Sequence, residues 1–322
     1  MLHPNYIKMA PMAGLAGLGG GALNLAYKSA GAGGATTWYG DRALVFGGTP
    51  TGSFYNKIDY YDITSTGNAS DFGDTTQARG YASACGSGIL AAYGGGISIN
   101  TIDYVTVSTT ANAQDWGDLT TGGSGNGAAS SLERGLWFGG WDRNNIIDYI
   151  TWTSTGNAVD FGDCSTTRKN VGASSNGTKA AAFGGVDGSN NVQNSWDVVT
   201  IDSTSNATDA GDISQAMSNT GPCGNEDRTI IFGGWPNTRV NEIQYRDIST
   251  NGNTTDFGDL TSNRDQIGGA NNATRATANG GWDSWTTNKI EYVTINSTGN
   301  SSDFGDLIGT PSYPGAASGA AS

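Results

Sequence analysis

Pairs of aspartates three positions apart recur six times along this chain of 322 residues. The first pair lies in "STGNASDFGD", and the six pairs begin at Asp71, Asp115, Asp160, Asp209, Asp256 and Asp303. Two carboxylates could contribute to a calcium site or act as the acid and base of a glycoside hydrolase. Calcium takes roughly six to eight oxygen ligands, however, and no pair differs from the others as a catalytic pair would. The recurrence therefore favours a structural role, in which one aspartate accepts backbone N–H groups in a turn and no metal is bound.

Aromatic side chains gather in the connections whose length varies between copies, namely Phe54, Tyr55, Trp141, Trp235, Trp282 and Trp285. A flat aromatic ring suits the apolar face of a sugar, and the neighbouring Asp and Asn residues suit its hydroxyl groups. Trp141, Trp235 and Trp282 each follow a Gly-Gly pair directly, and this shared position favours packing between neighbouring repeats. Phe54, Tyr55 and Trp285 lie deeper in their loops and are the stronger binding candidates.

The rest of the composition argues against an enzyme. His3 is the only histidine, so a Ser-His-Asp set cannot be assembled, and the glycine-rich segments lack the lysine and helix of a phosphate loop. The cysteines, Cys85, Cys164 and Cys223, match no zinc spacing and are expected to be buried. A net charge of −13, with 16 scattered Lys and Arg residues, disfavours nucleic acid as a partner. We expect no catalytic residue, no metal and no cofactor.

Three landmarks show that the chain beyond residue 37 is a repeat array. The first aspartates are 44, 45, 49, 47 and 47 residues apart, a glycine pair closes an apolar run in each copy, and a segment such as "IDYVTV" follows. The glycine pairs begin at Gly47, Gly94, Gly139, Gly184, Gly233 and Gly280. A period of about 46 residues is typical of propeller blades.

Each repeat predicts four strands. The second strand ends at the glycine pair, the third is the "IDYVTV" segment, the fourth is "DFGD", and the first is a run of small residues such as "GYASACGSG". Small side chains fit the crowded axis of a ring of blades. The turn before the fourth strand always contains an asparagine, which we interpret as a residue that tolerates a left-handed backbone. These asparagines are Asn68, Asn112, Asn157, Asn206, Asn253 and Asn300.

The two ends of the array complement one another. The tail after Asp306 reads "LIGTPSYPGAASGAAS", which aligns with a first strand but has no second strand after it. The opening "GDRALVFGG" is a second strand without a convincing first strand. We therefore expect the C-terminal strand to close the ring, which removes exposed strand edges; the alternative is that "GGATTWYG" fills the place. The prediction is an all-β, six-bladed β-propeller with four antiparallel strands per blade over residues 38–322.

A basic residue precedes the second strand in five copies, as Arg42, Arg134, Lys179, Arg228 and Arg275. Each could reach an aspartate of a neighbouring repeat. A structural ion pair or a solvated charge is the favoured interpretation, in preference to catalysis.

Residues 1–37 lie outside the repeats and are apolar but broken by glycine. Such a segment cannot form a core alone, and its apolar side chains are costly to leave in water. We predict an extended docking arm that orders against another protein; a disordered leader is the alternative. The segment fits neither a signal peptide nor a membrane span. The candidate docking residues are Leu2, Tyr6, Ile7, Met9, Met12, Leu15 and Leu18.

The Phe-Gly-Gly followed by an Ile-Asp-Tyr strand resembles a kelch-type propeller blade. The fuller pattern, which adds "STGNA" and "DFGD", resembles repeats in virion structural proteins of tailed bacteriophages over about residues 38–319. The chain departs from kelch proteins in its fourth strand, where tryptophan is mostly replaced by phenylalanine and once by Ala210.

The resemblance implies a kelch-like, non-enzymatic virion protein on the outside of the particle, on the tail in preference to the head, and in several copies. Its arm would bind other virion proteins, and its loops would contact a host cell-surface glycan or a neighbouring subunit, without membrane insertion. Two alternatives remain open: a capsid decoration or fibre protein without a receptor role, and a carbohydrate-active enzyme.

Overall fold

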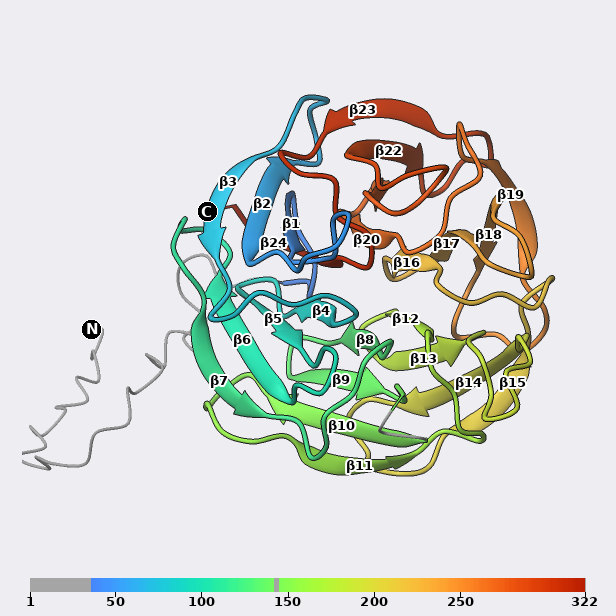
Figure 1. Ribbon diagram of the computed structural model, residues 1–322. Coiled ribbons are helices and arrows are strands. Elements are labelled where there is room, and N and C mark those ends of the chain that lie inside the picture. The colour runs from blue at the N-terminus through green and yellow to red at the C-terminus, as the bar shows by residue number, and fades with distance from the viewer. Residues whose placement is uncertain (1–35, 142–144, 322) are drawn as a thin grey trace, which may run out of the picture.

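A computed structural model describes residues 36–141 and 145–321. Within these residues, 24 strands form six four-stranded antiparallel sheets, and no helix is present. Figure 1 shows the sheets standing around a common axis like the blades of a propeller. The predicted all-β, six-bladed β-propeller is therefore confirmed.

The strands occupy four positions in each blade, and blades 1 to 6 follow one another around the ring. From blade 1 to blade 6, the innermost strands are β24 (Gly315–Gly319), β4 (Ser83–Gly86), β8 (Gly127–Ser130), β12 (Gly172–Ser175), β16 (Gly221–Gly224) and β20 (Gly268–Asn271). The second strands are β1 (Arg42–Phe46), β5 (Leu90–Gly94), β9 (Arg134–Phe138), β13 (Lys179–Phe183), β17 (Thr229–Gly234) and β21 (Arg275–Asn279). The third strands are β2 (Lys57–Asp62), β6 (Thr101–Thr106), β10 (Ile146–Thr151), β14 (Ser195–Thr200), β18 (Val240–Arg246) and β22 (Lys289–Thr294). The outermost strands are β3 (Ser70–Asp74), β7 (Gln114–Asp118), β11 (Val159–Asp163), β15 (Thr208–Asp212), β19 (Thr255–Asp259) and β23 (Ser302–Asp306).

The C-terminal strand closes the ring, as the sequence predicts. β24 pairs antiparallel with β1, with Arg42 opposite Gly319 and Phe46 opposite Gly315. Blade 1 is therefore built from both ends of the array, so that the last strand of the chain completes the first sheet.

The innermost strands carry small residues because neighbouring blades crowd together at the axis. A methyl group added at Gly127 would lie 2.8 Å from Cβ of Ala173 in the next blade. No side chain fits at this approach unless the neighbouring blade shifts.

The hydrophobic core is divided into six clusters, each lying between two adjacent blades. Between blades 2 and 3, the indole rings of Trp116 and Trp152 meet edge to face with their centroids 5.7 Å apart. The three cysteines are buried, as predicted. Because no blade has a core of its own, the ring is the smallest unit that buries these surfaces.

The repeated asparagine fastens one blade to the next. Oδ1 of Asn112 in blade 2 accepts a hydrogen bond from the backbone N–H of Asp74 in blade 1 at 3.0 Å. The same bond joins Asn157 to Asp118, Asn206 to Asp163, Asn253 to Asp212, Asn300 to Asp259 and Asn68 to Asp306. The expected left-handed conformation is wrong, because none of these six asparagines has a positive φ. Their role depends on the side chain instead.

The first aspartate of the repeated pair accepts a backbone bond within its own strand. Oδ1 of Asp115 accepts from the N–H of Gly117 at 3.1 Å, and Asp160, Asp209 and Asp256 make the equivalent bond. Gly117 has φ +143°, and a methyl group there would lie 2.5 Å from a backbone carbon of Gly156 in the next blade. The motif is thus an irregular stretch of the outermost strand and a blade-to-blade contact, which agrees with its structural interpretation, although the bond lies in a strand and not in a turn.

Four of the five basic residues at the start of the second strands, all of them arginines, bind carbonyl groups of the next blade instead of an aspartate. Arg134 donates to the carbonyl of Ile201 in the next blade at 2.8 Å, and its guanidinium lies 4.7 Å from the ring centre of Tyr149. Arg42, Arg228 and Arg275 make equivalent contacts. The guanidinium reaches across the blade interface because the third strand of the next blade ends beside it.

Candidate binding face

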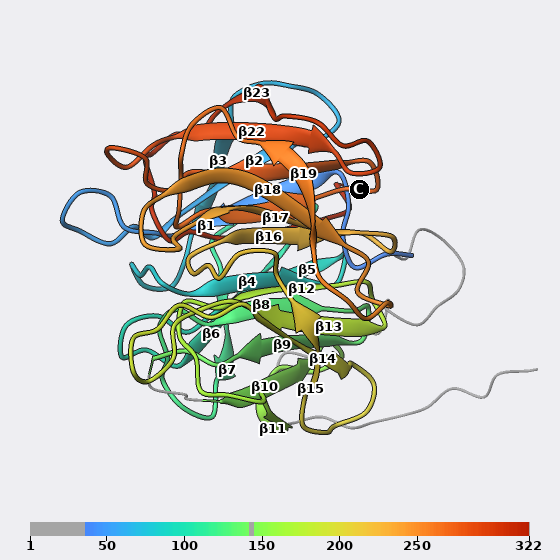
Figure 2. The same cartoon turned by 90° about the vertical axis from the view of Figure 1, so that its right-hand side faces the viewer.

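Two sets of connections lie on the same face of the ring, which we call the loop face. One set follows the second strands, for example residues 47–56 and 235–239, and the other precedes the innermost strands, for example residues 75–82. Figure 2 shows the ring edge-on, with the longer loops projecting to one side. The opposite face, which we call the turn face, carries the tight turns with the asparagines.

Exposed apolar side chains concentrate on the loop face. Among the described residues, six large apolar side chains are exposed, and Val159 alone lies on an outermost strand. The other five occupy loop-face connections: Phe54, Ile97, Trp141, Trp285 and Ile308. Five exposed apolar side chains on one face make that face the better candidate for an interaction surface.

The aromatic candidates from the sequence differ in how far they are exposed. Trp141 and Trp285 are 61% and 70% exposed, so the expected packing of Trp141 between blades is wrong. Trp141 follows Gly140, whose φ is +115°, and its ring lies outside the core under the ammonium of Lys169, 3.3 Å from the ring centre. Phe54 is exposed, while Tyr55, Trp235 and Trp282 are half-buried.

A ring of six residues with left-handed backbone surrounds the axis on the loop face. Their φ values lie between 51° and 67°, and the residues are Tyr81, Gly125, Asn170, Asn219, Gln266 and Tyr313. Backbone hydrogen bonds connect neighbouring members at five of the six steps around the axis, for example from Gly125 N–H to the Tyr81 carbonyl at 2.7 Å, and at the sixth step the N–H of Val171 donates to the Gly125 carbonyl. Five of the six are not glycine, and such a conformation costs about 1 kcal/mol or more per residue.

This axial ring was not predicted from the sequence. The six residues occupy one repeated sequence position, two residues after Arg79 and its counterparts, which is filled in turn by Tyr, Gly, Asn, Asn, Gln and Tyr. Asn and Gly at such a position indicate positive φ, but the variable residue type hides the repeat.

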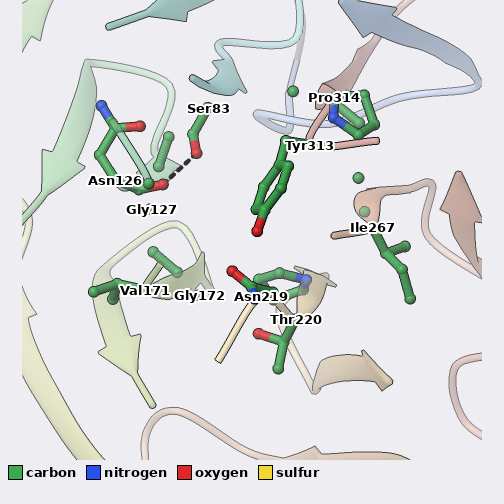
Figure 3. A pocket seen from close by; sticks show the side chains of 18 of the residues that line it. Ser83, Asn126, Gly127, Val171, Gly172, Asn219, Thr220, Ile267, Tyr313 and Pro314 are labelled. Atoms are coloured by element: carbon green, nitrogen blue, oxygen red, sulfur yellow. Dashed lines mark hydrogen bonds between the residues drawn. The ribbon is translucent and has the colours of Figure 1, made fainter. Parts of the chain in front are cut away.

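The axial ring encloses a small polar hollow. Its volume is about 80 Å³, and Figure 3 shows Tyr313 and Asn219 pointing toward one another across it. Oδ1 of Asn126, Oδ1 of Asn219 and Oγ1 of Thr220 are buried there without a hydrogen-bond partner among the described residues. Burial raises the pKa of the Tyr313 and Tyr81 phenols, so both stay neutral at physiological pH. The hollow has room for several water molecules.

A larger pocket of about 300 Å³ lies beside the axial ring, lined by Tyr81, Tyr313, Trp282 and Arg239 with residues 49–52 of blade 1. The rings of Tyr81 and Tyr313 stack with their centroids 3.8 Å apart and form one wall. The residues come from blades 1, 2, 5 and 6, and the ring brings them together at one side of the axis.

The guanidinium of Arg239 is held at the edge of this pocket. We call the cavity the Arg239 pocket. Nε of Arg239 donates to Oδ1 of Asp265 at 2.8 Å, and Gln266 donates to the other carboxylate oxygen at 3.3 Å. The guanidinium lies 5.0 Å from the ring centre of Trp235 and 5.7 Å from that of Trp282. Burial raises the pKa of the Asp265 carboxyl, and the bond from Arg239 opposes this shift. Arg239 was not among the candidates from the sequence, because it is a lone cation in its loop.

Buried ion pairs lie beneath the loop face in alternate blades. They join Arg79 to Asp103 at 3.2 Å, Arg168 to Asp197 at 2.6 Å and Arg264 to Glu291 at 3.5 Å. Each acid also accepts from a Ser or Thr that follows the outermost strand of the preceding blade. These carboxylates hold neighbouring blades together through the bonds from the preceding blade. Within residues 36–141 and 145–321, no three His, Cys, Asp or Glu side chains are grouped to hold a metal ion.

The described chain enters the ring at the turn face. Trp38 and Tyr39 line a hollow at that end of the axis, and the Tyr39 hydroxyl donates to Glu226 of blade 5. The candidate docking residues Leu2, Tyr6, Ile7, Met9, Met12, Leu15 and Leu18 lie outside the described residues. In the part of the chain that is described, no helix has the length and apolarity required to cross a bilayer.

The fold defines the class of this protein as a six-bladed β-propeller. No known protein family matches the chain, and no curated protein sequence matches it.

Proposed function

We propose that this chain is a non-enzymatic structural protein of a bacteriophage virion, whose loop face binds a glycan of the host surface. The observation that carries the binding role is that Phe54, Ile97, Trp141, Trp285 and Ile308 are all exposed on the same face of the ring. Exposed indole rings can pack against the apolar face of a sugar, and the neighbouring amide and charged groups can bind its hydroxyl groups. The virion setting rests on the resemblance of the repeats.

A binding role without catalysis agrees with the use made of the acidic residues. Four first aspartates of the repeats accept backbone bonds in their own strands, and the buried third-strand acids Asp103, Asp148, Asp197 and Glu291 hold Arg, Ser or Thr groups. A glycosidase would need two carboxylates facing one cleft. On the loop face, Asp265 has both oxygens occupied by Arg239 and Gln266.

Attachment to the particle would use residues 1–37. The described chain begins at Thr36, and Trp38 lines the hollow at the axis on the turn face, so the segment joins the ring on the face opposite the loop face. The loop face would then point away from the particle, with the tail as the proposed location and several copies on each virion. A chain lacking residues 1–37 is expected to fold but to be absent from assembled particles.

The experiment that tests glycan binding compares the full-length chain with a Trp141→Ala/Trp285→Ala variant on arrayed bacterial surface polysaccharides. Both side chains are exposed, so their removal is expected to leave stability within about 0.5 kcal/mol and to weaken binding. Thr110→Ala, an exposed change on the turn face, is the matched control and should bind as the unaltered chain does. Absence of binding to any polysaccharide would reject the receptor role and favour a capsid decoration protein.

A further inference from the structure

We propose that the Arg239 pocket selects carboxylated sugars, with the guanidinium of Arg239 binding the sugar carboxylate and the aromatic walls packing against the sugar ring. This inference rests on the proposed glycan-binding function and specifies the chemical class of the glycan. The pocket, the orientation of the cation and the aromatic walls carry it.

The cation is oriented before any ligand arrives. Asp265 is 2% exposed at its side chain and takes Nε of Arg239, while Trp235 and Trp282 lie against the guanidinium. An arginine held through Nε keeps the edge formed by its two terminal amino groups for a second partner. Among residues 36–141 and 145–321, neither Nη atom of Arg239 has a hydrogen-bond partner, and the side chain is 28% exposed.

The anion that fits this edge is a planar carboxylate. The guanidinium edge offers two parallel N–H donors, whose spacing matches the two oxygens of a carboxylate. The neighbouring acid, Asp265, is already bound to Arg239 and Gln266, so it fixes the cation and does not compete for the exposed edge. Since the whole chain carries a net charge of −13, an anionic ligand needs a local cation such as this one.

The rest of the pocket suits a sugar. Its volume of about 300 Å³ lies at the lower end of ligand pockets, which span roughly 300–1,000 Å³. The stacked Tyr81–Tyr313 pair and Trp282 supply apolar faces, and the exposed Thr51 supplies a hydroxyl group at the rim. One acidic monosaccharide unit can therefore place its carboxylate at Arg239 and its ring between the aromatic side chains.

The test measures calorimetric binding of trigalacturonic acid and of sialyllactose to the full-length chain, each beside its uncharged methyl ester. At least one acid is expected to bind about tenfold or more tightly than its ester, as a charge-assisted bidentate contact requires. Arg239→Gln should abolish this preference. Lys57→Gln removes the same charge from a side chain that is 53% exposed outside the pocket, and it should leave the preference unchanged.

Folding of the variants is checked by thermal unfolding. Arg239→Gln leaves the buried Asp265 without its cation, so Arg239→Gln/Asp265→Asn is the second variant, which restores a neutral pair and should also lack the preference. Equal binding of acids and esters, no binding of either acid, or a preference that survives in both variants would overturn the inference. If neutral polysaccharides on the array still bind, the proposed glycan-binding function stands without the preference for carboxylated sugars. If no polysaccharide binds, both the glycan-binding function and the preference are rejected.

Discussion

Asn112 and Asp74 lie 38 positions apart and belong to different blades, yet Oδ1 of Asn112 accepts the backbone N–H of Asp74 at 3.0 Å. The next residue, Ala113, donates its N–H to the Asp74 carbonyl at 2.8 Å. Both backbone groups of Asp74 are therefore satisfied by the neighbouring blade. Repeated six times, this relationship turns a sequence motif into a belt of hydrogen bonds around the outside of the ring.

Removal of one belt bond should be measurable. Asn112→Ala is expected to lower the free energy of unfolding by about 0.5–1.5 kcal/mol, because the backbone N–H of Asp74 loses its acceptor. Urea unfolding measures the change, and Thr110→Ala in the same turn serves as the control. If the two variants are equally stable, the asparagine side chain has no part in fastening the blades.

The glycine inside the repeated pair should tolerate substitution less well than the glycine it faces. Gly117 and Gly156 both have positive φ, at +143° and +152°, but a methyl group at Gly117 would lie 2.5 Å from a backbone carbon of Gly156. At Gly156, nothing lies within 4 Å of an added methyl group. Gly156→Ala is expected to cost about 1–3 kcal/mol from backbone strain, and Gly117→Ala should cost more. Thermal unfolding of the two variants makes the comparison, and an equal loss would contradict the close approach of the blades.

The third-strand acids should give opposite responses to pH. Burial would raise the pKa of Glu291, but Arg264 and bonds from Ser301 and Thr261 outweigh it and hold the pKa below its usual value. Burial raises the pKa of Asp59, whose Oδ1 has no hydrogen-bond partner among the described residues. In blade 6, Arg264 precedes the innermost strand and pairs with Glu291. The equivalent position before the innermost strand of blade 1 is Pro311, which cannot form an ion pair with Asp59.

The sign of each pH dependence follows from these directions. The lowered pKa of Glu291 contributes stability above the unfolded pKa, and this stability is lost as pH falls through the folded pKa. The raised pKa of Asp59 has the opposite effect: its contribution to stability is present at acid pH and is lost as pH rises through the folded pKa. Glu291→Gln should therefore cost about 3–5 kcal/mol at neutral pH, because it leaves buried Arg264 unpaired. Asp59→Asn should stabilise the chain at neutral pH and lose this advantage near about pH 3. Urea unfolding at both pH values tests the pair; stabilisation by Glu291→Gln at neutral pH would contradict the assignment.

Loss of the closing strand should open the ring. Deletion of residues 315–322 removes β24, which pairs with β1 over five residue positions, and exposes the edge of β1. The truncated chain is expected to lose cooperative unfolding and to aggregate, because an unpaired strand edge invites pairing with other chains. Calorimetry and light scattering report these effects. A monomer that unfolds cooperatively near the original temperature would show that closure is not needed.

The fold could be predicted because the same local signals occur six times. The small innermost strands, the Gly-Gly ends and the unpaired second strand at Arg42 each point to the same ring. The role of Asn112 could not be predicted, because its bond crosses between blades and depends on their relative placement. The Arg239 pocket was missed for a similar reason: Arg239, Trp282 and Tyr313 come from different connections, and only the closed ring brings them together. Trp141 is exposed whereas Trp235 and Trp282, which also follow a glycine with positive φ, are half-buried, so neither residue type nor the glycine pair fixes the burial of this tryptophan.

The most direct test of the proposed working face is a hydrogen-exchange measurement on the full-length chain with and without a polysaccharide that binds it on the array. We expect slower exchange in loop-face connections, above all residues 49–56, 234–240 and 281–287, and unchanged exchange in the turns at 64–69 and 108–113. Protection confined to those turns, with the loop face unaffected, would contradict this expectation.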